Sequence, residues 1–378
     1  MTETGEELPL FEIAWDEREV KNVIDSVTRG GYWANGPYVS EFEGRLRRYF
    51  GVEHAPVVNS GTSALVCALQ ACGIGNGDEV IVPSFTFIAT ANAVKLVGAT
   101  PVFADIEPST YGLDPDDVRT KITPETSAVI PVHVYGASCR IAELAEITDE
   151  HGIWLVEDAA EAFGAKHGGQ NVGTFGDLAA LSFCQNKVIT TGEGGAVVTD
   201  DHGLAENVRL FRSHGRASKE YFGSVESGEY VALGSNLRMA DVVASIGCAQ
   251  IEKVERLVEG RRAAARRMGE RLSDVEGVVP HSALDGDRHV YQIYTIEFED
   301  ETQRPRAIEA LTADGIASKV YWDPPVHRTR YYRSISDPVS LPTTDSIAGR
   351  VLSLPIHPNI TRAETDRICA SVAAALDQ

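Results

Sequence analysis

The stretch LSFCQNKVITTGEGGAVVTD, residues 181–200, places one lysine in an unusual setting. Lys187 lies between an apolar run typical of a buried strand and a loop rich in glycine. A lysine on a solvated helix face would instead have charged neighbours. A lysine in a partly closed cleft gives up its proton more readily and can attack an aldehyde. The stretch therefore indicates a reactive lysine whose partners must lie elsewhere in the chain.

The composition is that of an ordinary globular protein. The 378 residues are 43% hydrophobic and 24% charged, which suits one large domain and a smaller one. A formal net charge of -21 repels nucleic acid and anionic membranes, and the acidic stretch MTETGEELPL differs from the basic-then-apolar pattern of a signal peptide. No apolar run is long enough for a membrane span, and the six cysteines form no CxxC pair. We therefore expect a cytoplasmic protein with no metal site that binds neither nucleic acid nor membrane.

Residues 50–200 alternate between short apolar runs and amphipathic stretches with helical spacing. The apolar runs are residues 55–58, 80–82, 100–104, 128–134, 153–156, 178–183 and 196–198, and the helical stretches include 62–71, 88–97 and 141–150. Strands that are apolar on both faces and alternate with helices predict a largely parallel sheet covered on both sides. Ligands gather at the carboxyl ends of such strands. The residues just after each run are therefore the candidates for a site.

The stretch NSGTSALVCAL, residues 59–69, follows one of these strands and opens a helix. Ser60, Gly61 and Thr62 place free N–H groups and hydroxyls at the positive end of the helix dipole, a ready phosphate site. A serine that only caps the helix would give the same pattern. Both interpretations stay open at this point.

Two carboxylates, Glu157 and Asp158, end the very apolar strand in IWLVEDAAEAFGA. A buried carboxylate is costly unless it meets a cation or several donors. We expect Glu157 to be exposed in a turn and Asp158, which is followed by small residues, to meet a buried cation. A phosphate site, a buried carboxylate and a reactive lysine together indicate pyridoxal 5′-phosphate (PLP) chemistry.

The C-terminal third has a different organisation. The spacing of apolar residues over 241–272 fits one long amphipathic helix, or two joined near Gly260. Its arginines Arg261, Arg262, Arg266 and Arg267 are best explained as a solvated helix face. Strand, helix and strand patterns follow, so we expect a smaller α+β domain over residues 255–378 after a large domain over 1–254.

At this point the chain resembles a known family, the DegT/DnrJ/EryC1/StrS sugar aminotransferases. The resemblance covers nearly the whole chain, and its motifs are GYWANGPYVSEFE, NSGTSAL, PSFTFIATANAVKLVGATPVFADI, VEDAAEAFGA, SFCQNKVITTGEGGAVVTDD, GSNLRMADVVASIGCAQIEK and VLSLPIHPNIT. It implies an aspartate-aminotransferase-like α/β fold, fold type I among PLP enzymes, with a mostly parallel sheet in the large domain. It also implies PLP as cofactor, with pyridoxamine 5′-phosphate as the form that carries the amino group.

The resemblance assigns roles to individual residues. Lys187 resembles the lysine that binds PLP covalently and moves the proton, and Asp158 resembles the partner of the pyridine nitrogen. Phe87 corresponds to the aromatic side chain on the cofactor ring. Asn236 resembles an asparagine that reaches the phosphate from the neighbouring subunit, which implies a homodimer with shared active sites. The phosphate ligands implied within the subunit are Ser60, Gly61, Thr62 and Ser182.

The implied reaction moves an amino group from an amino acid, with L-glutamate preferred, to a ketone of a nucleotide-linked sugar. The preferred acceptor is a C4 ketone of a dTDP-linked deoxy sugar, because GYWANGP resembles relatives that act at C4, and a C3 ketone is the alternative. The candidate substrate contacts, for each of which ordinary packing is also open, are Tyr32, Trp33, Asn35, His214, Arg216, Arg238 and His327.

Two features separate this chain from parts of the family. Residue 161 is usually glutamine or histidine and is here Glu161, close to the cofactor in relatives. Related PLP-dependent sugar dehydratases replace the lysine with histidine, so Lys187 favours amino transfer over dehydration. A non-catalytic regulatory relative is a further alternative, which the presence of both Lys187 and Asp158 disfavours.

Overall fold

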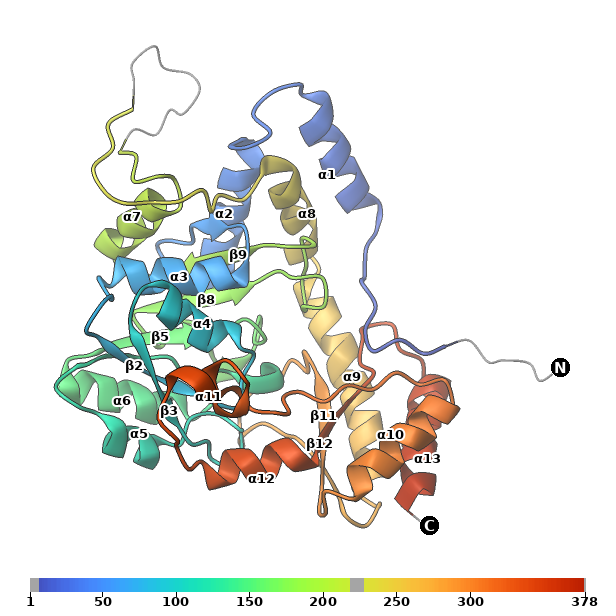
Figure 1. Cartoon of the computed structure of the whole chain (residues 1–378). Coiled ribbons are helices and arrows are strands. Elements are labelled where there is room, and N and C mark those ends of the chain that lie inside the picture. Colours follow the sequence, from blue (N-terminus) through green and yellow to red (C-terminus); the bar gives the residue numbers. More distant parts are fainter. Residues whose placement is uncertain (1–6, 218–227, 377–378) are drawn as a thin grey trace.

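The computed structural model describes residues 7–217 and 228–376. Within these residues the largest sheet has seven strands in the order β1-β9-β8-β5-β4-β2-β3 (Figure 1). The pairs from β8 to β3 are parallel, and β9 runs antiparallel to both of its neighbours. The prediction of a mostly parallel sheet is confirmed. The strands are β1 (Val57–Val58), β2 (Glu79–Pro83), β3 (Thr100–Ala104), β4 (Thr126–Val129), β5 (Trp154–Asp158), β8 (Leu178–Ser182) and β9 (Gly195–Val198).

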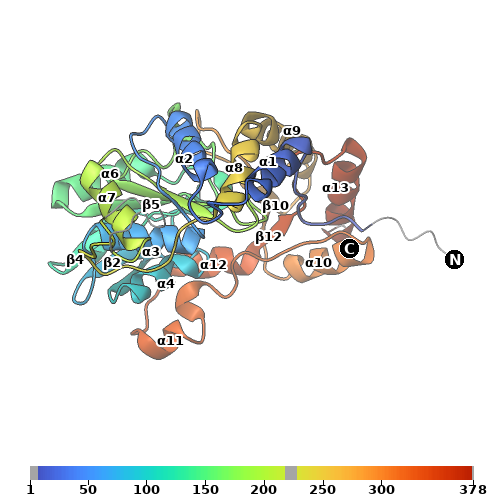
Figure 2. The ribbon, with the colours of Figure 1, turned by 90° about the horizontal axis from the view of Figure 1, so that it is seen from above.

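Helices cover both faces of this sheet, because neighbouring strand residues point to opposite sides. Val80 and Val82 pack in the cluster that contains α3, α4 and α7, whereas Ile81 between them packs against α6 on the other face. The opposite face is also covered by α2 and α8, and Figure 2 shows the resulting layers from above. The helices of this part are α1 (Glu17–Thr28), α2 (Pro37–Phe50), α3 (Gly61–Ala71), α4 (Ala89–Leu96), α5 (Pro115–Lys121), α6 (Ile141–His151), α7 (His202–Phe211) and α8 (Asp241–Ile251). A short 3-10 turn, η1 (Val134–Gly136), and a small hairpin of β6 (Lys166–His167) and β7 (Gln170–Asn171) complete it.

A smaller antiparallel sheet, in the order β10-β11-β12, forms the core of the C-terminal part. Its apolar side packs against α9, α10 and α13, which stand at one end of the molecule in Figure 1. Leu8, near the start of the chain, joins this core and its N–H donates to the Gly315 carbonyl. The elements are α9 (Val254–Leu272), β10 (Val278–Pro280), β11 (Tyr294–Phe298), α10 (Gln303–Ala313), η2 (Val326–Arg328), α11 (Tyr332–Ile335), α12 (Pro342–Arg350), β12 (Val351–Leu354) and α13 (Arg362–Leu376). The division of the chain at residues 254 and 255 stays a prediction.

The segment 241–272 forms two helices, but the joint is not where the sequence placed it. The break falls at Glu252 and Lys253, between α8 and α9, and Gly260 lies inside α9. A side chain at Gly260 would collide with Pro358, since an added Cβ would lie 2.5 Å from its carbonyl oxygen. The glycine therefore serves close packing and not a hinge.

Arg261 contradicts the prediction of a solvated arginine face. It is buried, and its guanidinium donates to the carbonyls of Tyr291, Gln292 and Ile356. Burial lowers the pKa of Arg261 to about 10. The side chain thus joins α9 to the loops of the C-terminal sheet.

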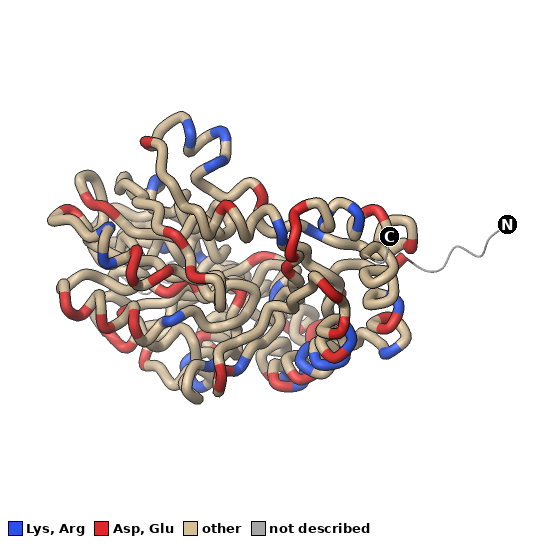
Figure 3. Tube along the Cα trace, turned by 90° about the horizontal axis from the view of Figure 1, so that it is seen from below, with Lys and Arg blue, Asp and Glu red and all other residues tan. Residues whose placement is uncertain are grey.

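Two surveys of the described ranges gave negative results. None of the helices between residues 7 and 376 that the structure describes has the length and apolarity of a membrane span. In the same residues no three His, Cys, Asp or Glu side chains gather in a group that could bind a metal. Acidic and basic residues are interspersed along the Cα trace shown in Figure 3.

Candidate active site

A pocket of about 360 Å³ lies at the carboxyl ends of the parallel strands. This volume lies in the range of small-molecule sites. Tyr321 and Trp322, from the C-terminal part of the chain, contribute to its wall. The predicted residues that line it are Ser60, Gly61, Thr62, Phe87, Asp158, Glu161, Ser182 and Lys187. Segments more than a hundred residues apart therefore meet here, as the rule for parallel sheets predicts.

The first turn of α3 forms one end of the pocket. Ser60 caps the helix, since its hydroxyl accepts from the Ser63 N–H at 3.1 Å. The other N–H groups of a first helical turn have no partner inside the helix, and the dipole makes this end attractive to an anion. A Cβ on Gly61 would lie 2.7 Å from that of Ser182, so only glycine allows this approach. Capping and a phosphate cradle are therefore compatible, and the donors present suit a phosphate group.

Asp158, at the end of β5, is 5% exposed. Its Oδ2 accepts from the Thr90 hydroxyl at 2.8 Å and its Oδ1 from the Ala160 N–H at 3.2 Å. Burial raises the pKa of Asp158, and these hydrogen bonds and the charge of Lys187 act against the rise. A carboxylate held in this way is well suited to a cation or a protonated ring nitrogen in the pocket.

Glu157 is buried on the opposite face of the sheet, which contradicts the prediction of an exposed turn. Its carboxylate accepts from the His133 ring at 3.0 Å and from the backbone N–H groups of Gly173, Phe175 and Gly176 at 2.7 to 2.8 Å. These four donors replace the water that burial removes. Glu157 therefore fixes the strand end that carries Asp158.

Lys187 and Glu161 form an ion pair inside the pocket. Lys187 Nζ lies 3.3 Å from Glu161 Oε1, and Glu161 Oε2 accepts from the Tyr135 N–H at 3.0 Å. The Lys187 N–H donates to the Cys184 carbonyl, which closes the turn after β8. The turn also meets the C-terminal part, because the Gln292 amide donates to the Asn186 carbonyl at 2.6 Å. The lysine is thus held at a defined place, and Glu161 is its neighbour.

Several predicted substrate residues lie outside this pocket. Tyr32, Trp33 and Asn35 are exposed in the connection between α1 and α2. Around Ser213 a second group gathers, in which Ser213 pairs with Asn236 and its hydroxyl accepts from Arg238.

That second group also holds His214 and Arg216. His214 donates its N–H to the Ser235 carbonyl, and Arg216 pairs with Tyr230 in a short bridge. Asn236, His214, Arg216 and Arg238 are therefore brought together with one another, although none of them lines the pocket of the same chain.

His327 is 9% exposed and also does not line the pocket. Its Nδ1 lies 2.6 Å from the Ser84 hydroxyl, and its Nε2 lies 3.4 Å from Asp345. Burial lowers the pKa of this ring. The described contacts of His327 thus tie η2 to the end of β2.

Sequence reasoning missed several contributors to the pocket, among them Thr90, Tyr321 and Trp322. Thr90 lies on α4, one turn from Phe87, so its place beside Asp158 depends on the packing of two distant segments. Tyr321 and Trp322 carry no pattern that marks them, apart from the aromatic run VYW before two prolines.

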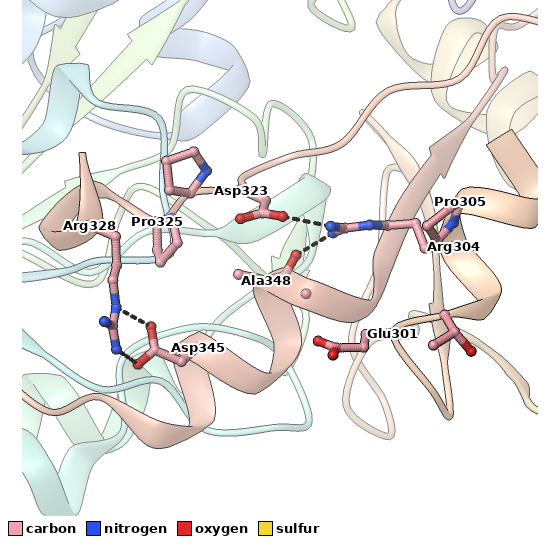
Figure 4. Close-up of a pocket in the computed structure, with 11 residues that line it drawn as sticks. Glu301, Arg304, Pro305, Asp323, Pro325, Arg328, Asp345 and Ala348 are labelled. Atoms are coloured by element: carbon pink, nitrogen blue, oxygen red, sulfur yellow. Dashed lines mark hydrogen bonds and ion pairs between the residues drawn. The ribbon is translucent and has the colours of Figure 1, made fainter. Parts of the chain in front are cut away.

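A second pocket, of about 600 Å³, is lined by Asp323, Pro325 and residues of α10 and α12 (Figure 4). Two ion pairs join four of its charged groups: Arg304 donates to Asp323 at 2.6 Å, and Arg328 binds Asp345. The smaller pocket combines a lysine, a buried carboxylate and a helix N-terminus. We therefore place the chemistry in the smaller pocket.

Several solved structures similar to this one are described as aminotransferases. Helicobacter pylori PseC, an aminotransferase involved in the biosynthesis of pseudoaminic acid, superimposes with a TM-score of 0.92 at 29% identity, over 98% of this chain and 100% of that one. S. venezuelae DesV gives a TM-score of 0.91 at 34% identity, over 98% and 99% of the two chains. The aspartate-aminotransferase-like fold is confirmed.

A model of the DegT/DnrJ/EryC1/StrS aminotransferase family matches residues 15–373, and the chain belongs to this family. GDP-perosamine synthase from Caulobacter vibrioides is 39% identical over 98% of this chain and 99% of its own length. The protein is a PLP-dependent sugar aminotransferase, as the resemblance implied.

Proposed function

We propose that this enzyme transfers the amino group of L-glutamate to a keto group of a nucleotide-linked deoxy sugar. The observation that carries the proposal is that Lys187 and Asp158 line the same pocket as the N-terminus of α3. Bound PLP would act as an electron sink, which would let the donor carbon lose its proton during transfer of the amino group. Such chemistry needs a covalent anchor, a negative group at the ring nitrogen and an anion site, and each has a candidate here.

Each of these tasks can be assigned to particular residues of the pocket. Lys187 would anchor the cofactor and carry the proton between donor carbon and cofactor. Asp158 would keep the ring nitrogen protonated, and Phe87 would cover the ring. The phosphate would be held by Ser60, Gly61, Thr62 and Ser182.

We further propose a homodimer in which each subunit completes the site of the other. Phe87 lines the pocket and yet is 59% exposed. Val20, Ile24 and Val27 form an exposed apolar stripe at helical spacing on α1. A second copy over these surfaces would bury them and could bring Asn236 to the phosphate. Sedimentation at micromolar concentration tests this, and a monomer with full activity would contradict it.

The acceptor is proposed as a C4 ketone of a dTDP-linked sugar, with a C3 ketone as the second candidate. The second candidate has its own support, because a relative from Acidithiobacillus ferrooxidans, 38% identical over 86% of this chain and 85% of its own length, carries the name UDP-N-acetyl-3-dehydro-alpha-D-glucosamine 3-aminotransferase. The names of the relatives mention GDP and UDP, so the nucleotide must be varied in any test.

The deciding experiment incubates the PLP-loaded enzyme with glutamate and a panel of 3-keto and 4-keto sugars linked to dTDP, GDP and UDP. NMR of the product locates the new amine, and recovered 2-oxoglutarate confirms the donor. Product without incorporated nitrogen would indicate a dehydratase. No reaction with any sugar, together with retained PLP binding, would favour a regulatory protein. Amination of a simple keto acid alone would indicate a general aminotransferase.

A further inference from the structure

The segment PVHVYG, residues 131–136, runs beside the end of β5 and borders the pocket. The Asp158 N–H donates to the Pro131 carbonyl at 2.8 Å, and the His133 N–H donates to the Asp158 carbonyl at 3.2 Å. Val132, between these two residues, lines the pocket. The segment is therefore a backbone partner of the strand end that carries the candidate catalytic aspartate.

Tyr135, in the same segment, adopts a conformation that tyrosine rarely takes. Its φ is 57°, in the left-handed region, and the ring is fully buried. A non-glycine residue in this region is unfavourable and persists only where surrounding contacts enforce it. In this conformation its N–H points at Glu161 Oε2, while Glu161 Oε1 faces Lys187 Nζ.

Gly136, the next residue, packs closely against Glu161. A Cβ there would lie 3.1 Å from the Glu161 carbonyl oxygen and 2.7 Å from Val290 Cγ2. The φ of Gly136 is 98°, which other residues avoid. The side chain of Glu161 is thus bound by Tyr135, and the absence of a side chain at Gly136 leaves room for the Glu161 backbone.

The side chain of Tyr135 reaches the opposite wall of the pocket. Its hydroxyl donates to the Tyr321 carbonyl, and its ring stacks on Trp322 with centroids 5.6 Å apart and planes at 19°. Both partners line the pocket. Just beyond them, Asp323 is bound by Arg304 on the outer side (Figure 4). Residues 321–323 are therefore held from the inside by Tyr135 and from the outside by Arg304.

We propose that Tyr135 is a positioning residue for the amino-transfer reaction. Tyr135 joins the Glu161–Lys187 pair to the pocket wall formed by Tyr321 and Trp322. This inference rests on the proposed function. One residue fixes the neighbour of the reactive lysine through its backbone and the facing wall through its side chain. Loss of the hydroxyl removes the hydrogen bond to Tyr321 and leaves the ring stack as the remaining contact, so the wall, Trp322 included, is held less firmly and substrate is held less well relative to Lys187.

Tyr135→Phe tests the proposal, with Tyr111→Phe as the matched control. Tyr111 lies in the same aromatic cluster, 6.2 Å from Tyr135 between centroids, and its hydroxyl donates to Glu297 at 2.7 Å, away from the pocket. Each variant loses one buried hydroxyl. We expect Tyr135→Phe to lower kcat/KM for the keto sugar about tenfold with PLP affinity unchanged, because small displacements of reacting groups are costly. Tyr111→Phe should stay within about twofold of the parent. Equal losses in the two variants would overturn the proposal.

A second measurement needs neither cofactor nor substrate. With Trp15, Trp33 and Trp154 replaced by phenylalanine, Trp322 is the only tryptophan in the chain. Acrylamide should then quench the fluorescence of Trp322 more strongly in the Tyr135→Phe variant than in the single-tryptophan parent. In the Tyr111→Phe variant the quenching should equal that of this parent. Unchanged quenching in both variants would refute the link to the wall even if no keto sugar proved to be a substrate. Failure of the sugar panel with increased quenching would instead refute the proposed function alone.

Discussion

Glu161 Oε1 lies 3.3 Å from Lys187 Nζ, and its other oxygen is held by the backbone of Tyr135. According to the family resemblance, relatives usually have glutamine or histidine at position 161, where this chain has glutamate. A glutamine has one accepting oxygen, so it could accept from the lysine or from the Tyr135 N–H, and its NH₂ group would face the other donor. The geometry therefore gives Glu161 a role in holding Lys187 in place, and glutamine can fill that role only in part.

Glu161→Gln should accordingly keep part of the activity, because its one oxygen can still accept from Lys187, whereas Glu161→Ala should lose nearly all of it. We expect the glutamine variant to stay within about tenfold of the parent and the alanine variant to fall about 100-fold, since misplaced acid–base groups cost that much. Single-turnover rates with glutamate measure the effect. If glutamine were as damaging as alanine, the charge itself would be essential.

Lys187→Ala should remove the covalent attachment of the cofactor. We expect the variant still to bind PLP through the proposed phosphate site and Asp158, but it has no amine to form the bond. We expect the visible band of lysine-bound PLP to disappear and amino transfer to stop. Absorption spectra before and after desalting measure this, with Lys166→Ala as a control for loss of a lysine outside the pocket. Full turnover in Lys187→Ala would refute the assignment of the lysine.

Asp158→Asn should raise the stability of the cofactor-free protein and lower the activity of the loaded enzyme. Burial raises the pKa of Asp158 above its unfolded value, so its favourable contribution to stability is fully present below the unfolded pKa and is lost as the pH rises through the folded one. At neutral pH the buried charge destabilises the cofactor-free protein. Asparagine removes this cost, and it cannot keep a ring nitrogen protonated.

We therefore expect the apparent Tm of cofactor-free Asp158→Asn to rise by about 2 °C at pH 7.5, with the gain shrinking as the pH is lowered. Turnover of the loaded variant should fall at least about 100-fold. Differential scanning fluorimetry across a pH series and a glutamate half-reaction assay give the two readouts. A lower Tm at neutral pH would show that the carboxylate is needed for folding.

The sequence predicted the sheet and the main chemical groups of the site, because these depend on local patterns. Strand ends mark Asp158 and Ser182, and the start of a helix marks Gly61. Glu157 was placed wrongly because its four donors come from residue 133 and from the loop after β7, which no spacing reveals. Trp322 and Tyr135 were missed for the same reason, since their roles arise where distant segments pack. The break after α8 was misplaced at Gly260 because a glycine needed for close packing looks like a glycine needed for a bend.

Glu157→Gln tests whether the buried carboxylate supports the strand end. An amide has one accepting oxygen, so its NH₂ group would face two of the present donors. Leaving buried N–H groups without an acceptor costs about 1–3 kcal/mol each, so we expect a clear loss of stability and weaker PLP binding. Urea unfolding and PLP titration measure these effects. Glu143→Gln, on the exposed surface of α6, is the control and should change neither.

Because His281 is buried, we expect the protein to lose stability in mild acid. Its ring is buried between Tyr111 and His289, and burial lowers the pKa of His281 to about 4 and that of His289 well below its usual value. Since both rings are neutral in the folded protein, their contribution is present above the unfolded pKa and is lost as the pH falls below about 6.5. For His281 the loss continues down to about pH 4.

Between pH 7 and pH 5 this ring alone should reduce the free energy of unfolding by about 2 kcal/mol. His281→Gln should therefore be less stable than the parent at pH 7 and yet lose less stability on acidification. Urea unfolding at both pH values, with the exposed His202→Gln as control, measures the difference. The same pH dependence in His281→Gln and in the parent would mean that His281 is protonated in the folded protein or shielded in the unfolded one, and would contradict the prediction.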